Sequence, residues 1–218
     1  MSIVIVTSVA IGLLIGLISA EKTGRPARIL IFKTPLSLLF IVAWSLQSPH
    51  NELFSNLILS ALVCCCAGDI LLAFGSPRTF LFGLFAFLLG HVMFAAAFYV
   101  AGTIGPWMGV GVIIVVVVSG TIWRWLEPHL GTMTVPVLAY LVLISTMICG
   151  AGAIIGNSHI PDLTRFAVFS GAVLFYLSDI AVARQRFVIS DPMNRVVGLP
   201  LYYGAQFVLA FSSAWIPT

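Results

Sequence analysis

The chain has 218 residues, of which 61% are hydrophobic and only 8% are charged. This composition is far too apolar for a soluble domain of the same length, so it indicates an integral membrane protein with almost no chain left for a separate soluble domain. The net charge of +3 comes from short segments between apolar runs, so we expect it to set membrane topology, and we expect no nucleic-acid partner.

Eight apolar runs approach or reach the length that a transmembrane helix needs, about 17 to 25 residues. The first run has its basic residues after it rather than before it, so we read it as a retained helix and not as a cleaved signal peptide. The runs are too long and too continuously apolar for barrel strands, and they predict an all-α, polytopic membrane bundle in one domain, 1–218. The expected helices are 3–20, 29–46, 56–74, 79–99, 107–122, 132–155, 163–183 and 198–216.

Basic residues are concentrated in every second loop. The odd-numbered loops hold Lys22, Arg25, Arg28, Arg78, Arg124, Arg184, Arg186 and Arg195. The loops of the other side hold only Arg165. Because basic loops stay in the cytoplasm, this bias predicts eight transmembrane helices with both termini on the non-cytoplasmic side. The short loops favour a bacterial inner membrane as the location.

Two aspartates lie inside apolar runs. Asp69 is in the third run and Asp179 is in the seventh, and each is preceded by a small residue and followed by Ile. A carboxylate in hydrocarbon is costly, so intramembrane acids are usually functional. At ~1.5 Å per residue, both lie one to two turns from the cytoplasmic ends of their helices. We therefore expect the two acids to lie at the same depth.

Other polar side chains are expected in this layer. They are Lys33, Tyr140, Tyr202, Tyr203 and Gln206. Tyr176 lies three residues before Asp179 and so shares its helix face, whereas His91 is deeper, near the midplane. The run 107–122 contains almost nothing polar, so we expect that helix to be peripheral.

This polar layer suits acid–base chemistry. Two nearby carboxylates in low dielectric share one proton, so one acid can donate a proton while the other, ionised, activates water. Lys33 could balance a negative charge, bind an anionic head group, or extend to the membrane interface. Tyr202 and Tyr203 could position water or belong to an interfacial aromatic belt. His91 could act chemically or only pack between helices.

The remaining candidates for chemistry are weaker. The four cysteines, Cys64, Cys65, Cys66 and Cys149, lie in apolar runs and are expected to pack as small apolar side chains. The other histidines, His50, His129 and His159, fall in loops on different sides, so no metal site is expected. The aspartates themselves could be structural partners of Lys33 or of a tyrosine.

Five segments, taken in order along the chain, resemble the YhhN family, the lysoplasmalogenase family of eight-helix membrane proteins. They are Lys33-Thr34-Pro35, AGDILLAFG, GHVMFAAAFY, FYLSDIAVARQRF and PLYYGAQFVLAFS. The resemblance covers nearly the whole chain and implies the same fold and a catalytic role for Asp69 and Asp179. It also points to Lys33, His91, Tyr203 and Gln206 as site residues, and it implies no metal or organic cofactor.

Members of this family cleave the vinyl ether bond of lysoplasmalogens, which releases a fatty aldehyde and a glycerophospho-base. The reaction protonates the β-carbon to give an oxocarbenium ion, to which water adds. One protonated and one ionised carboxyl group suit these two steps. The resemblance therefore predicts a membrane hydrolase whose partners are a vinyl-ether lysophospholipid and the surrounding membrane lipids, with the oligomeric state left open.

Two other functions stay open from the sequence. An intramembrane aspartyl protease also pairs two membrane aspartates, and the segment before Asp69 is similar to its Gly-x-Gly-Asp motif, although Cys66 stands at the first glycine position. A proton-coupled transporter or lipid-binding protein could use the acids as a proton relay. Release of free aldehyde by the purified protein would distinguish the hydrolase from both.

Overall fold

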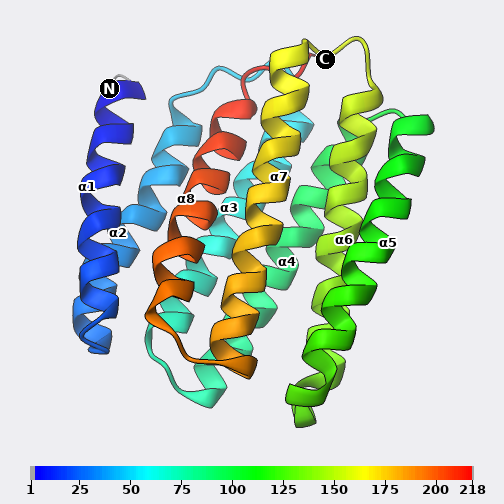
Figure 1. The fold of residues 1–218 in the computed structure, drawn as a ribbon. Helices are drawn as coiled ribbons and strands as arrows, with labels where there is room; N and C mark the ends of the chain where they lie inside the picture. Colours follow the sequence, from blue (N-terminus) through cyan, green and yellow to red (C-terminus); the bar gives the residue numbers. More distant parts are fainter. Residues whose placement is uncertain (1–2, 218) are drawn as a thin grey trace.

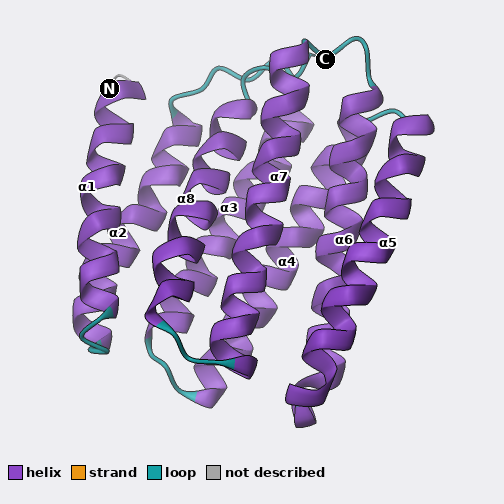
Figure 2. Ribbon diagram, viewed as in Figure 1, coloured by secondary structure: helices purple, strands orange, loops and turns teal. Residues whose placement is uncertain are grey.

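The computed structural model describes residues 3–217, and within that range every regular element is a helix (Figure 2). The long helices are α1 (Ile3–Glu21), α2 (Pro26–Ser45), α3 (Glu52–Ala73), α4 (Pro77–Ala101), α5 (Pro106–Leu126), α6 (Thr134–Gly156), α7 (Asp162–Ala183) and α8 (Pro192–Ser212). They run alternately up and down, so that the start of α1 and the end of α8 lie at the same end of the bundle, the upper end in Figure 1. The expected all-α bundle is confirmed.

The central helices are those that carry the polar residues. α3 packs most extensively on α4, and α7 on α8, while α2 contacts both α3 and α8. α6 joins α4 to α7. α1 and α5 lie at opposite edges of the bundle (Figure 1). Only Val115 and Leu126 of α5 are buried, so the expected peripheral position of this helix is confirmed.

Seven of the helices in residues 3–217 are long and apolar enough to cross a membrane. Many of their large apolar side chains are exposed on the outside of the bundle, where lipid would surround them. The protein is thus an integral membrane protein with several spans. α8 falls outside this group because it carries Asn194, Arg195 and Gln206 together with two tyrosines.

The expected bounds 198–216 for the last helix were wrong at both ends. α8 begins at Pro192, where proline is favoured because the first helical N–H needs no partner, and the Asp191 side chain accepts a hydrogen bond from the Met193 N–H at 2.9 Å. It ends at Ser212. Residues 192–197, which are expected in a loop, therefore form the first turns of α8.

Two other segments expected as loops are helical. Arg184–Val188 continues α7 as a single π-helical turn, and two 3₁₀ turns, Glu127–His129 and Gly131–Met133, fill the connection from α5 to α6. A π-helical turn is wider than an α-helical one, and such turns often occur at functional sites. Here the turn lies at the lower end of the bundle in Figure 1, beside the cavity described below.

Glycine allows close contact between α3 and α4. A Cβ atom added at Gly90 would lie 2.9 Å from Sγ of Cys65 and 3.3 Å from the carbonyl oxygen of Ala61. Such distances are too short without movement of α3, and Gly90 immediately precedes His91 in the sequence. The absence of a side chain at this position therefore helps to set the place of His91 against α3.

We expect Gly90→Ala to destabilise the protein and Gly111→Ala to leave its stability unchanged or slightly raised. Overpacking a close contact costs about 1–3 kcal/mol, whereas a Cβ at Gly111 meets nothing within 4 Å and gains about 1 kcal/mol of helix propensity. Thermal unfolding in detergent measures both variants. Equal melting temperatures would contradict close packing of α3 on α4 at this level.

Candidate active site

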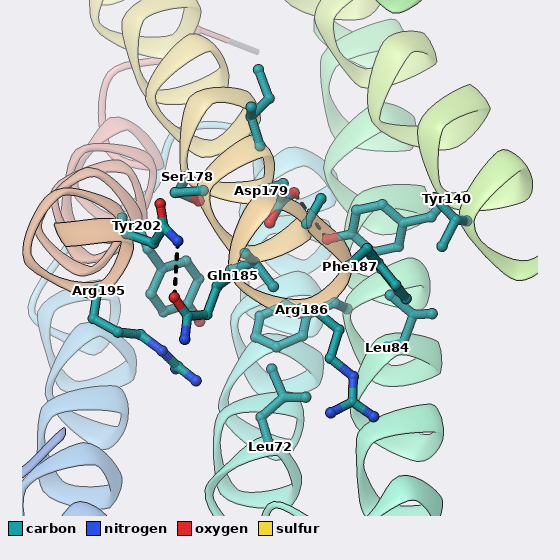
Figure 3. A pocket seen from close by; sticks show the side chains of 18 of the residues that line it. Leu72, Leu84, Tyr140, Ser178, Asp179, Gln185, Arg186, Phe187, Arg195 and Tyr202 are labelled. Atoms are coloured by element: carbon teal, nitrogen blue, oxygen red, sulfur yellow. Dashed lines mark hydrogen bonds between the residues drawn. The ribbon is translucent and has the colours of Figure 1, made fainter. Parts of the chain in front are cut away.

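A cavity of about 440 Å³ lies in the lower half of the bundle (Figure 3). Its lining includes both intramembrane aspartates, Asp69 and Asp179. Of the other side chains singled out from the sequence, the lining includes Lys33, Tyr140, Tyr176 and Tyr202. The expectation that two separate helices bring their acids to one site therefore agrees with the geometry.

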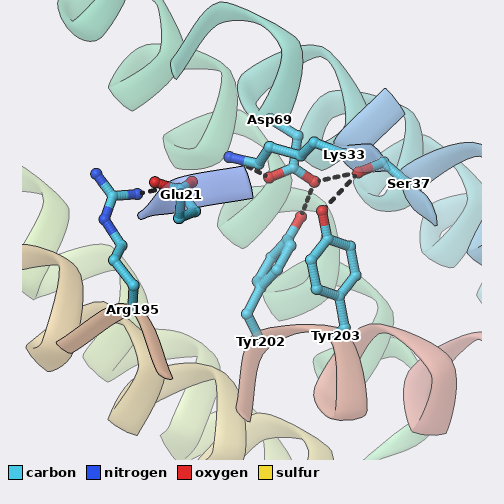
Figure 4. Close-up of polar contacts among 7 residues, drawn as sticks. All are labelled: Glu21, Lys33, Ser37, Asp69, Arg195, Tyr202 and Tyr203. Atoms are coloured by element: carbon cyan, nitrogen blue, oxygen red, sulfur yellow. Dashed lines mark hydrogen bonds and ion pairs between the residues drawn. The ribbon is translucent and has the colours of Figure 1, made fainter. Parts of the chain in front are cut away.

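Asp69 is enclosed by donors from two other helices (Figure 4). Its Oδ1 atom lies 3.2 Å from Nζ of Lys33, and its Oδ2 atom accepts hydrogen bonds from Oγ of Ser37 at 2.6 Å and from the Tyr202 hydroxyl at 2.8 Å. The residue is only 1% exposed. Three donors, one of them a cation, favour the ionised carboxylate. These contacts fix the orientation of the Asp69 carboxyl group.

Ser37 was missed from the sequence. Its Oγ donates to Asp69 and therefore accepts a hydrogen bond from the Tyr203 hydroxyl, 3.1 Å away. The signal that could have found it is spacing, since Ser37 follows Lys33 by four residues and so lies on the same face of α2. Tyr203 does not line the cavity, and it supports Asp69 only through Ser37.

Asp179 has different neighbours. Its Oδ2 atom accepts a hydrogen bond from the Tyr140 hydroxyl at 2.9 Å and lies 3.3 Å from Nε2 of His91. The side chain of Asp179 is 17% exposed, against 1% for that of His91. No cation from Lys or Arg lies within ion-pair distance of Asp179 in residues 3–217. The two acids therefore share a cavity but not an electrostatic environment.

The orientation of His91 bears on where a proton resides. Its Nδ1 atom lies 2.7 Å from the carbonyl oxygen of Phe87, which can only accept, so Nδ1 carries a hydrogen. In a neutral ring Nε2 is then bare, and a bare nitrogen would repel an ionised Asp179. The 3.3 Å contact is close enough for charge attraction, although Nε2 is not aligned for a hydrogen bond. His91 therefore presents Nε2 to Asp179 and Nδ1 to the backbone of α4.

The two carboxylates have separate hydrogen-bond and ion-pair partners throughout residues 3–217. The sharing of one proton between the two aspartates stays a prediction. Each acid has a basic side chain beside it, Lys33 beside Asp69 and His91 beside Asp179.

Two of the expected site residues make no hydrogen bond to either acid. Tyr176 lines the cavity, but its hydroxyl lies 2.8 Å from Oγ of Ser119, which in turn lies 2.7 Å from Oγ of Ser145. Gln206 does not line the cavity, and its buried amide has no hydrogen-bond partner among the residues that the structure describes. Tyr176 therefore forms part of the cavity wall, whereas Gln206 lies outside the cavity lining.

The rest of the cavity is amphipathic. Its lining includes apolar side chains, among them Leu84, Phe87 and Ile144. Polar side chains from the π-helical turn and the start of α8 form its polar rim, among them Gln185, Arg186 and Arg195 (Figure 3) and also Asn194. The Arg186 guanidinium lies 4.4 Å above the ring centroid of Phe80. Such a cavity suits a molecule with an apolar chain and a charged head.

No group of three or more His, Cys, Asp or Glu side chains that could hold a metal ion occurs within residues 3–217. The lining acids instead face hydrogen-bond donors. Two carboxyl groups in such different surroundings can take different protonation states within one cavity.

Comparison with known proteins decides the family. The sequence model of the YhhN family matches residues 29–213. The chain belongs to the YhhN family. No solved structure matches it significantly. The matched range contains both aspartates and every polar side chain described for this cavity, so the whole cavity lies within the part of the chain that the family model matches.

Several relatives share the name lysoplasmalogenase. A protein of Mycobacterium bovis named lysoplasmalogenase is 31% identical over 193 residues, covering 84% of this chain and 68% of its own. Lysoplasmalogenase TMEM86B of Rattus norvegicus is 29% identical over 184 residues, covering 84% and 71%. Lysoplasmalogenase TMEM86A of Bos taurus is 29% identical over 167 residues, covering 75% and 65%. This YhhN chain thus spans about two thirds of the length of these relatives.

The two adjacent tyrosines of α8 make a matched pair for testing the Asp69 site. We expect Tyr202→Phe to lower the free energy of unfolding by about 2 kcal/mol, because it removes a hydrogen bond to a buried charge. Tyr203→Phe removes a bond to a neutral hydroxyl and should cost about 1 kcal/mol. Chemical unfolding in detergent micelles measures the difference. A larger loss for Tyr203→Phe would contradict the assignment of Tyr202 as the direct donor.

Proposed function

We propose that this protein is a lysoplasmalogenase, a membrane hydrolase that cleaves the vinyl ether bond of a lysoplasmalogen to a fatty aldehyde and a glycerophospho-base. The observation that carries the proposal is the pair of aspartates in one amphipathic cavity, one held beside Lys33 and one held beside His91. The names of the mycobacterial and mammalian relatives support the same activity.

In the first step of the proposed mechanism, Asp179 acts as the acid. The proton of the His91–Asp179 pair moves to the β-carbon of the vinyl ether, and the double-bond electrons form the new C–H bond. The ether oxygen then shares the positive charge of an oxocarbenium ion. Tyr140 fixes the carboxyl group of Asp179 through its 2.9 Å hydrogen bond, and the apolar wall holds the alkenyl chain.

In the second step, Asp69 acts as the anion. Its negative charge stabilises the oxocarbenium ion and orients water for attack at the carbon bound to oxygen. Water adds, its extra proton passes to the carboxylate of Asp179 and restores the acid, and the resulting hemiacetal collapses to the aldehyde and the glycerol hydroxyl. Lys33, Ser37 and Tyr202 keep Asp69 in place and ionised during this step. Lys33 therefore balances charge in the proposed mechanism rather than binding the phosphate.

The chemical test uses protein purified in detergent with a vinyl-ether lysolipid. We expect free aldehyde in an amount equal to the glycerophospho-base, and no product from the matching 1-acyl or saturated 1-alkyl lysolipid, because neither has a double bond to protonate. Asp69→Asn and Asp179→Asn should each lower kcat at least about a hundredfold. Because Asp69→Asn leaves Lys33 without its buried counterion, kcat is compared at a temperature at which the melting curve shows that each variant is folded. Lipid transport across sealed vesicles without aldehyde would instead support a transporter.

We also propose that the chain forms a single membrane domain in which α8 spans together with the seven apolar helices, in a bacterial inner membrane with both termini outside the cytoplasm. The basic residues of the odd-numbered loops and the common end of α1 and α8 support this topology. The cavity rim would then open to the cytoplasmic leaflet.

A reporter fused to the C-terminus tests the topology. We expect an enzyme that is active only in the periplasm to be active there and a reporter that is active only in the cytoplasm to be silent. The same reporters placed in the loop between α7 and α8 should give the opposite result. If both fusions report the same side, α8 does not span.

A further inference from the structure

A second cavity of about 360 Å³ adjoins the first at the lower end of the bundle. It lies between the end of α1, the start of α2 and the start of α8, and Glu21, Lys22 and Ile29 are among its lining residues. The two cavities share Lys33, Leu72, Gly75, Gln185, Ser190 and Arg195. A molecule that occupies the first cavity can therefore extend into the second.

Glu21 and Arg195 form an ion pair in the lining of the second cavity. Nη1 of Arg195 lies 3.4 Å from Oε1 of Glu21 (Figure 4), and the Glu21 side chain is only 10% exposed whereas that of Arg195 is 42% exposed. Lys22 is exposed and makes no ion pair within residues 3–217. Lys33, the third cation of the lining, is committed to Asp69. Within residues 3–217 Lys22 is thus unpaired, and Arg195 is paired only with Glu21, so these two cations can meet an anion if Glu21 gains another partner.

We propose that this second cavity binds a zwitterionic head group, with the phosphate on Arg195 and Lys22 and the amine on Glu21. The assignment rests on the proposed function, which supplies a lysophospholipid as the substrate. Its physical basis is the partly buried Glu21. A phosphate alone would take Arg195 and leave this carboxylate unpaired, which is costly, whereas a phosphate and an ammonium together replace both partners of the pair.

The position of the second cavity fits the reaction. In a lysoplasmalogen only the glycerol unit separates the vinyl ether from the phosphate. Lys33 lines both cavities and lies 3.2 Å from Asp69, so the junction of the cavities is beside the proposed catalytic anion. A head group in the second cavity would leave the glycerol at the junction and the alkenyl chain along the apolar wall.

The start of α2 adds a favourable field. Pro26, its first residue, lines the second cavity, the first turn contains no acidic residue, and the N-cap makes no side-chain hydrogen bond. The N-terminus of a helix carries a partial positive charge and favours a nearby phosphate. This effect supports the phosphate position but would not by itself recognise an amine.

The test compares three vinyl-ether lysolipids that differ only in the head group: phosphocholine, phosphoethanolamine and phosphate alone. We expect Glu21→Gln to raise KM about tenfold for the two amines and to leave it unchanged or lower it for the phosphate, because only the amines use the carboxylate. Arg195→Gln should raise KM for all three by a similar factor. Arg28→Gln, an exposed basic residue that lines neither cavity, is the matched control and should change none.

Each other result overturns a defined part of the proposal. An equal rise for all three lipids in Glu21→Gln would mean that Glu21 only holds Arg195, and an unchanged KM in Arg195→Gln would remove the phosphate site. If wild-type protein releases no aldehyde from any lipid, the proposed function fails. Binding of uncleavable 1-alkyl lysolipids with the same three head groups, measured by calorimetry, then tests the head-group site with the same variants and the same expected order.

Discussion

Nζ of Lys33 and Oδ1 of Asp69 lie 3.2 Å apart, with at most 5% of either side chain exposed. Neither charge would be tolerated alone at this depth, since leaving one partner of a buried pair uncompensated typically costs about 3–5 kcal/mol. The pair therefore fixes the rotation and height of α2 against α3. Ser37 and Tyr202 complete the set, and the second of these ties α8 to the same point. Three helices are positioned by one carboxylate.

The two aspartates show how one residue type takes two roles. Their local sequences are similar, but the neighbours that the fold brings to them differ. Asp69 meets a lysine and two hydroxyls, whereas Asp179 meets an imidazole whose other nitrogen is already committed to the backbone of α4. Pairs of acids whose surroundings favour different protonation states are the usual basis of acid–base assignment. Here that difference comes from tertiary contacts rather than from the motif.

The sequence was informative where one physical effect dominates. The cost of a charge in hydrocarbon singled out Asp69, Asp179 and Lys33, and helix rise placed the acids in one layer. The sequence was uninformative about contacts that depend on the rotation of a helix or on the direction of a side chain. The hydroxyl of Tyr176 turns to Ser119 instead of the acids, and the pairing of Glu21 with Arg195 joins residues at opposite ends of the chain.

The error at α8 has the same origin. Asn194 and Arg195 are expected in a loop because they are polar, but they belong to the first turn of α8, where Asn194 is buried. Composition alone does not distinguish a polar loop from the polar first turn of a helix.

The low hydrophobicity of α8 has a consequence for biogenesis. A segment that carries an arginine, an asparagine and a glutamine has a weak drive to leave the translocation channel for lipid by itself. In the proposed topology α8 spans the membrane, and its extensive packing on α7 favours insertion of the two helices as a hairpin. A nascent chain that still lacks α8 holds Asp69 and Lys33 without Tyr202 and Arg195. The site is thus complete only once α8 has been made and has packed on α7 and α2.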